Sequence, residues 1–199
     1  AEGKIQEAQV GFKSVLELDP ENESAQAGSG RTERELTRRA TAKSEALRLL
    51  EQGRPALDQA ERYFYDKDAN YEELVHRVEV GQKLIKQAVE KDPQSALGHY
   101  LLGRAWEILG WLEKSEDCSR RATQLDPHFG PAHYQLGRLL IMRARIATMR
   151  DRVDREEANR CLEESFLALT RALQTGSGFD DENQKMLAHT KNGHTLLFD

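Results

Sequence analysis

The sequence predicts an all-α fold in which helix–turn–helix repeats stack into a solenoid. Three observations lead to this prediction. Apolar residues recur every three or four positions, and no stretch keeps the period of two that a strand requires. The five prolines stand where helical patterns begin or end. Finally, a run of identical residues returns at an offset of 34 positions, which is the spacing of a structural repeat.

The prolines divide the chain into helical segments. Pro20, Pro93 and Pro127 each follow an aspartate at the end of a helical pattern. The glycine and proline at 53 and 55 predict a break between a long charged helix over about 23–52 and a short helix over 55–66. Asn70 is then expected to cap a helix reaching residue 90, with Glu73 completing a capping box.

The repeat is clearest around Pro93 and Pro127, which are 34 residues apart. At this offset five positions carry the same residue twice: His99 and His133, Tyr100 and Tyr134, Leu102 and Leu136, Gly103 and Gly137, Arg104 and Arg138. Such a run of identities at one spacing is far beyond chance within a single sequence. Residues 96–129 and the segment that follows are therefore predicted to fold alike.

Within residues 96–129 the order of small and bulky residues is Leu102, Gly103, Trp106, Gly110, Ser115, Ser119, Ala122 and Pro127. This pattern resembles the tetratricopeptide repeat (TPR), a helix–turn–helix unit of 34 residues. The resemblance is clear over residues 3–20 and 81–140 and weaker elsewhere. It implies a right-handed α-solenoid with elongated helices, in which Gly103, Ser115 and Ala122 allow close helix contact and Trp106 and Leu102 fill the space between helices.

We expect residues 1–199 to form a single TPR-like solenoid that is a fragment of a longer chain. Residues 1–20 are interpreted as the second helix of a truncated repeat, and 21–95 as an irregular region of long helices. Residues 96–129 form the regular repeat and 130–178 a repeat with an extended helical hairpin. Residues 179–199 supply a C-terminal helix and a tail.

The extended repeat carries a seam of its own. Leu139, Met142, Ile146, Met149 and Val153 alternate by three and four, which is typical of a coiled-coil core. A second helix, capped by Asp154, has the same spacing of core positions, at Ala158, Leu162, Ser165, Leu169 and Ala172. Because no glycine or proline lies between residues 138 and 174, one continuous helix is the alternative. The repeat register at both ends favours an antiparallel hairpin.

Composition excludes several classes of function. A net charge of −5 argues against non-specific binding to nucleic acid or to an acidic membrane. There is no apolar run long enough to span a bilayer and no signal peptide, and the two cysteines suit a reducing compartment, so we expect a cytoplasmic protein. No nucleophile motif, phosphate loop or metal signature is present, and His99 and His133 are too far apart to share a metal. We therefore expect neither an enzyme nor a cofactor.

The TPR resemblance implies a binding protein, since such solenoids are usually non-catalytic scaffolds whose first helices line a concave groove. The groove positions carried over from the family pattern are Tyr100, Arg104, Glu107, Tyr134, Arg138 and Ile141. Tyr and Arg replace the Lys and Asn with which one subgroup grips chaperone tails, so that binding mode is not implied. A Tyr–Arg pair is suited to an acidic or aromatic group of a protein or peptide partner.

A second candidate surface follows the extended hairpin, where arginines flank the predicted seam on both sides. Its members beyond Arg138 are Arg143, Arg145, Arg150 and Arg152. The plainer interpretation is a solvated helix face. The alternative is a docking edge for an acidic partner.

Three functions follow from these patterns. The favoured one is a non-catalytic adaptor that binds a peptide or partner helix in the concave groove. The second is a regulatory or substrate-recruiting segment of a larger enzyme. The third is a self-assembly module, a homodimer in which the bare apolar face of residues 1–20 pairs between copies.

Overall fold

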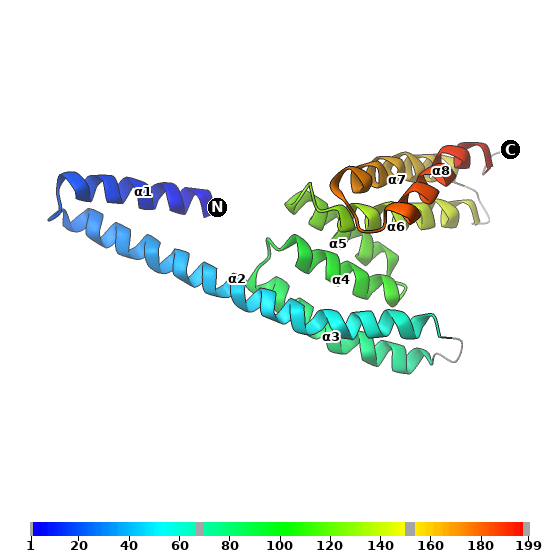
Figure 1. The fold of residues 1–199 in the computed structure, drawn as a ribbon, viewed down its shortest axis with the longest axis horizontal. Coiled ribbons are helices and arrows are strands. Elements are labelled where there is room, and N and C mark those ends of the chain that lie inside the picture. Colours follow the sequence, from blue (N-terminus) through cyan, green and yellow to red (C-terminus); the bar gives the residue numbers. More distant parts are fainter. Residues whose placement is uncertain (1, 67–69, 150–153, 197–199) are drawn as a thin grey trace. The chain divides into compact units, whose positions relative to one another are not determined.

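The computed structural model describes residues 2–66, 70–149 and 154–196, and within them every regular element is an α-helix (Figure 1). The predicted all-α fold class is confirmed. The helices are α1 (Glu2–Leu18), α2 (Glu23–Phe64), α3 (Tyr71–Lys91), α4 (Ala96–Ile108), α5 (Leu112–Leu125), α6 (Gly130–Met149), α7 (Arg155–Thr175) and α8 (Asp180–Leu196). The chain divides into two compact units, residues 1–48 and 49–199, with the division inside α2.

The first unit contains α1 and the part of α2 that ends at Arg48. Its turn follows the aspartate–proline pair at 19 and 20, where the Asn22 side chain accepts a hydrogen bond from the Ala25 amide at 3.0 Å. A Cβ built on Gly28 would lie 2.5 Å from the ring of Phe12, so the missing side chain is what admits the ring. Helix α1 therefore packs against the start of α2 inside this unit.

The predicted break at Gly53 and Pro55 is wrong, because α2 runs through both residues. A Cβ on Gly53 would lie 3.0 Å from the Gly81 carbonyl oxygen, and one on Gly81 would lie 2.8 Å from that of Gly53. Gly53 thus allows close contact between α2 and α3 and does not form a turn. Pro55 removes one helical hydrogen bond. Burial of the neighbouring Leu57, which packs against Gly81, offsets that cost.

Helix α3 begins where the sequence predicts. The Asn70 side chain accepts a hydrogen bond from the Glu72 amide at 2.8 Å, which satisfies one of the free donors of the first turn. Glu73 pairs with Arg77 instead of completing a capping box. The buried face of α3 is the predicted one, formed by Leu74, Val78, Gly81, Ile85 and Ala88.

In the regular repeat, α4 and α5 cross closely at small residues. A Cβ on Gly103 would lie 3.3 Å from both the Ser115 carbonyl oxygen and the Cys118 Cβ, and Ser115 and Ala122 are fully buried. Trp106, however, does not fill this space. It is half-buried, with Lys86 Nζ 4.9 Å and Lys114 Nζ 4.5 Å from the ring centroid. The indole is therefore bordered by one lysine of α3 and one of α5, and it is not fully buried between helices.

The two repeats begin in the same way. His99 Nε2 lies 3.1 Å from the Pro93 carbonyl oxygen, and His133 Nε2 lies 3.1 Å from that of Pro127. Each histidine therefore binds the turn that precedes its own helix. This shared contact gives a structural reason for the repeated histidine.

In the extended repeat, α6 and α7 run side by side in opposite directions, so residues 132–174 do not form one helix (Figure 1). The Asp154 carboxylate accepts a hydrogen bond from the Glu157 amide at 2.9 Å, as a cap of α7 should. Further along, Ser165 Oγ donates to the Gly137 carbonyl oxygen at 3.0 Å. The second bond ties the middle of α7 to the first half of α6.

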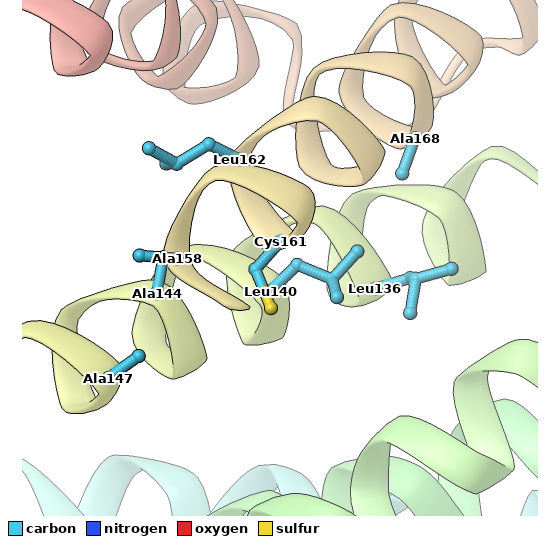
Figure 2. Close-up of a cluster of buried hydrophobic side chains, with 8 residues drawn as sticks. All are labelled: Leu136, Leu140, Ala144, Ala147, Ala158, Cys161, Leu162 and Ala168. Atoms are coloured by element: carbon cyan, nitrogen blue, oxygen red, sulfur yellow. The ribbon is translucent and has the colours of Figure 1, made fainter. Parts of the chain in front are cut away.

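The seam of α6 differs from the predicted one. The residues packed against α7 are Leu136, Leu140, Ala144 and Ala147, and they meet Ala158, Cys161, Leu162 and Ala168 (Figure 2). Met142, Ile146 and Met149 are exposed, although Leu139 is buried. Val153 lies outside the described residues. The prediction favoured large side chains, whereas alanines at 144 and 147 let the two helices approach closely.

Helix α8 runs from Asp180 to Leu196, within the segment in which the sequence predicts a C-terminal helix. Gly176 and Gly178 both have a positive φ, +74° and +78°, which shapes the turn before this helix. Ser177 Oγ accepts a hydrogen bond from the Phe179 amide at 3.1 Å. None of the helices in the described ranges is long and apolar enough to cross a membrane.

Candidate functional site

A groove of about 590 Å³ opens in the second unit along α2, α4, α6 and the start of α8. Five of the six predicted groove residues line it: Tyr100, Arg104, Glu107, Tyr134 and Arg138. The two Tyr–Arg pairs come from equivalent positions of α4 and α6. The 34-residue offset therefore places both pairs in one groove, as it should between first helices of neighbouring repeats.

Aromatic rings line the groove at Tyr100, Phe129, Tyr134 and Phe179. Tyr100 meets Phe129 edge-on, with ring centroids 5.4 Å apart, and Tyr134 stacks on Phe179 at 4.7 Å and 13°. Both are favourable aromatic geometries. Phe179 keeps 40% of its surface exposed, so part of this ring is accessible from the groove. Each repeat thus presents one aromatic pair.

Arg104 is held by carboxylates of α2. Its guanidinium donates to Asp58 Oδ1 at 3.0 Å and also pairs with Glu61. Only 15% of the Arg104 side chain is exposed, whereas Asp58 and Glu61 keep 39% and 40%. Arg104 therefore ties α2 to α4 through two ion pairs.

Arg138 is held in a similar way by α4. It donates to Glu107 Oε1 at 2.8 Å, and Gln135 Nε2 donates to Glu107 Oε2 at 3.1 Å. The buried Gln135 also accepts from Ser119 Oγ at 3.1 Å through its own Oε1. Glu107 is consequently fixed by two residues of the following repeat, which ties the walls of the groove together.

Burial decides the ionisation of the two tyrosines. It raises the pKa of Tyr100 and of Tyr134 above the ordinary value, more than the nearby arginines lower it. Both side chains are therefore neutral phenols at pH 7, able to donate as well as accept a hydrogen bond.

Ile141 is the exception among the six predicted residues. It packs with Met186 and Leu187 against the cluster of Tyr134, Leu169 and Ala172, so it supports the groove from below instead of lining it. The side chains of α8 cover this part of α6.

Several groove residues were not anticipated from the sequence. Asp58 and Glu61 come from a helix more than 40 residues before Arg104, and no local pattern signals that contact. Phe129 and Phe179 each stand just before the start of a first helix, α6 and α8. An aromatic residue repeated at helix starts is the signal that could have indicated them.

Within the described part of the predicted arginine edge on α6, Arg138 and Arg143 are paired with carboxylates of this chain. Arg143 pairs with Glu157 at 2.9 Å and with Glu116 at 3.1 Å, because the hairpin brings α5 and α7 to this side of α6. Arg145 is exposed. Arg150 and Arg152 lie outside the described residues.

Metal binding and thiol chemistry are the other possibilities to compare with the described part of the chain. No group of three or more His, Cys, Asp or Glu residues there is arranged to hold a metal ion. Burial raises the pKa of the Cys118 thiol to about 11 and also raises that of Cys161, so both thiols are protonated and unreactive at neutral pH.

Comparison with known proteins supports the fold. The structure is similar to TTC0263, a thermophilic TPR protein of Thermus thermophilus, with a TM-score of 0.50 and 19% identity; the match covers 95% of this chain and 91% of TTC0263. It is also similar to a human IFIT1 dimer with m7Gppp-AAAA, with a TM-score of 0.53 and 16% identity, over 96% of this chain and 43% of IFIT1. No protein-family model and no curated protein matches the sequence.

The fold is therefore TPR-like, as the sequence resemblance implied. Two of its helix pairs, α4–α5 and α6–α7, are successive repeats of the same unit, and their first helices share one groove.

Proposed function

We propose that the protein is an interaction module that binds a peptide or helical segment of a protein partner in the groove between α2, α4, α6 and α8. The observation that carries this proposal is the repeated Tyr–Arg pair, which meets aromatic rings and ordered charges in one open cavity of about 590 Å³. Two equivalent positions in one groove suit an extended or helical ligand that contacts both repeats.

Ion pairs between helices hold the charged side chains of the groove in place. Arg104, Arg138 and Glu107 are fixed by ion pairs between neighbouring helices. A groove that is ordered before binding loses less conformational freedom when a partner docks. The stacked rings of Tyr134 and Phe179 provide the kind of aromatic anchor that is enriched in interfaces.

The charge of the partner needs its own argument. The sequence favoured an acidic partner because of the arginines. Because Arg104 and Arg138 already bind carboxylates of this chain, an anionic ligand would have to compete with Asp58, Glu61 and Glu107 for the same donors. The arginines alone therefore no longer favour an acidic partner.

A nucleic acid is the alternative raised by the similarity to IFIT1, which has been determined with m7Gppp-AAAA. Its phosphates require uncompensated positive charge. Carboxylates outnumber guanidinium groups among the residues that line the groove, four to three. We therefore propose a protein partner, and we expect no binding of an oligoadenylate RNA in a fluorescence anisotropy titration at physiological salt.

The proposal is tested by comparing what the wild-type chain and two variants capture from a cell lysate. Tyr134→Ala with Phe179→Ala removes the stacked pair of the groove, and Arg121→Ala changes an exposed residue on α5 as the control. We expect partners found by mass spectrometry to be lost only with the groove variant. Because Tyr134 is buried, its removal also lowers stability, so capture is carried out below the melting temperature that circular dichroism gives for each variant. Equal capture by all three proteins would refute the proposal.

Self-assembly through α1 is the second candidate, because Val10 and Leu18 of this helix are 65% and 90% exposed. Light scattering over a concentration series measures it. A mass that stays monomeric at high protein concentration argues against this candidate.

A further inference from the structure

The groove carries more acidic than basic groups. Its lining includes the carboxylates of Asp58, Glu61, Glu107 and Glu182 and the guanidinium groups of Arg54, Arg104 and Arg138. The carboxylates are in excess. This surplus agrees in sign with the net charge of −5 of the whole chain.

The arginines and the carboxylates also differ in how available they are. The guanidinium of Arg104 already donates to Asp58 and Glu61, and its side chain is largely buried. Both carboxylates, in contrast, keep about two fifths of their side chains exposed. A carboxylate has about four acceptor positions, so pairing with one guanidinium leaves capacity for a second donor. Asp58 also lies 3.9 Å from the guanidinium of Arg54, whose side chain is 62% exposed, so the free acceptor positions on the α2 side belong mainly to Glu61.

The opposite side of the groove offers a second acceptor. Glu182 is exposed in the first turn of α8 and forms no ion pair with any residue in the described ranges. It lies one turn after Phe179, whose ring is 40% exposed and stacked on Tyr134. An aromatic face beside a free carboxylate favours an arginine or lysine side chain, by cation–π contact and by a charge-assisted hydrogen bond.

From this arrangement we infer that the groove selects a cationic partner segment: arginine or lysine side chains that reach Asp58 and Glu61 on one side and Glu182 on the other, with an apolar side chain on the rings between them. The inference rests on the proposed function, and it replaces an acidic ligand with a basic one. Complementary charge would then set the orientation and the specificity of binding.

Three synthetic peptide series test the inference. Each peptide is short and has a central aromatic residue, flanked on both sides by arginines, by serines or by glutamates. Binding of the fluorescein-labelled peptides to the full chain is measured by anisotropy at low and at high salt. We expect the arginine series to bind about tenfold or more tightly than the glutamate series, and this difference to shrink at the higher salt.

Glu182→Gln and Glu113→Gln form the matched pair of variants. Both residues are exposed in the first turn of a helix, and both changes remove one charge, but Glu113 does not line the groove. We expect Glu182→Gln to weaken the arginine series about tenfold, as loss of a charge-assisted contact should, and Glu113→Gln to leave it unchanged. A circular dichroism melt checks that both variants fold.

The outcomes separate this inference from the proposed function. Tighter binding of the glutamate series, or equal binding of the arginine and serine series, overturns the cationic partner while leaving a peptide-binding groove. An equal effect of Glu182→Gln and Glu113→Gln also overturns it. Failure of all three series to bind, together with capture that does not depend on Tyr134 and Phe179, overturns the groove itself and this inference with it.

Discussion

The regular and the extended repeat begin alike and end differently. Both open with a histidine bound to its preceding turn, followed by a tyrosine and an arginine that line the groove. Helices α4 and α5 have 13 and 14 residues, however, while α6 and α7 have 20 and 21. The comparison teaches that the residues of the turn, the groove and the first close helix contact are repeated, whereas those that set helix length and the later packing are not.

The largest expected effect concerns the seam that only the extended repeat has. Leu140 is 1% exposed within it, so Leu140→Ala should lower the free energy of unfolding by about 2–5 kcal/mol. Met149, which the sequence pattern places in the seam, is 73% exposed, and Met149→Ala should change stability by less than about 0.5 kcal/mol. Urea unfolding measures both. A larger loss of unfolding free energy for Met149→Ala than for Leu140→Ala would show that the seam has the register predicted from the sequence.

The second prediction compares the equivalent glycines of the two repeats. A Cβ at Gly137 would lie 2.6 Å from Leu169 Cγ, whereas one at Gly103 would meet its nearest neighbour at 3.1 Å. Gly137→Ala should cost about 1–3 kcal/mol through overpacking. Gly103→Ala should be close to neutral, because the smaller overlap is offset by the roughly 1 kcal/mol helix preference of alanine. Thermal melts of both variants check the difference.

A double mutant sharpens this comparison. If the Leu169 side chain causes the strain, Gly137→Ala should cost less in a Leu169→Ala background than in the wild type. Thermal melts of the four proteins provide the cycle. Strict additivity would show that the overlap with Leu169 is not the reason.

How far the sequence predicts this structure depends on the range of the interaction. The close contact of Gly103 with Ser115 follows from a local pattern within one repeat. The presence of Tyr100 and Tyr134 in one groove follows from the 34-residue offset. The path of α2 through Pro55 does not, because the contact of Gly53 with Gly81 joins two helices across a turn. Nor does the burial of Arg104, whose carboxylate partners lie 43 and 46 residues earlier in the chain.

The third prediction compares the two groove arginines. Arg104 binds two carboxylates and is half as exposed as Arg138, which binds one. Arg104→Ala leaves Asp58 and Glu61 without their shared cation, so it should lower stability by up to about 1 kcal/mol, and Arg138→Ala by less. The difference in melting temperature should narrow at high salt. A larger loss with Arg138→Ala would mean that the α4–α6 pair is the stronger tie.

The smallest expected effect concerns the cysteines of the two second helices. Because burial holds the pKa of Cys118 at about 11, above its ordinary value, the thiol stays protonated in the folded chain at mildly alkaline pH. Labelling by a thiol reagent should therefore be slow there, rise as the pH approaches that pKa, and become fast at mildly alkaline pH once urea unfolds the chain. Rapid labelling of Cys118 in the folded chain at neutral pH would contradict this burial.

The most direct test of the groove is site-specific photo-crosslinking to a captured partner. A benzophenone amino acid is placed at Leu97 or Glu182, which line the groove, and at Glu113 or Arg121 on α5, which do not. We predict that the partner is crosslinked from both groove positions and from neither control position. Crosslinks from Glu113 or Arg121 alone would contradict the assignment, because the partner would then lie on the second helices of the solenoid.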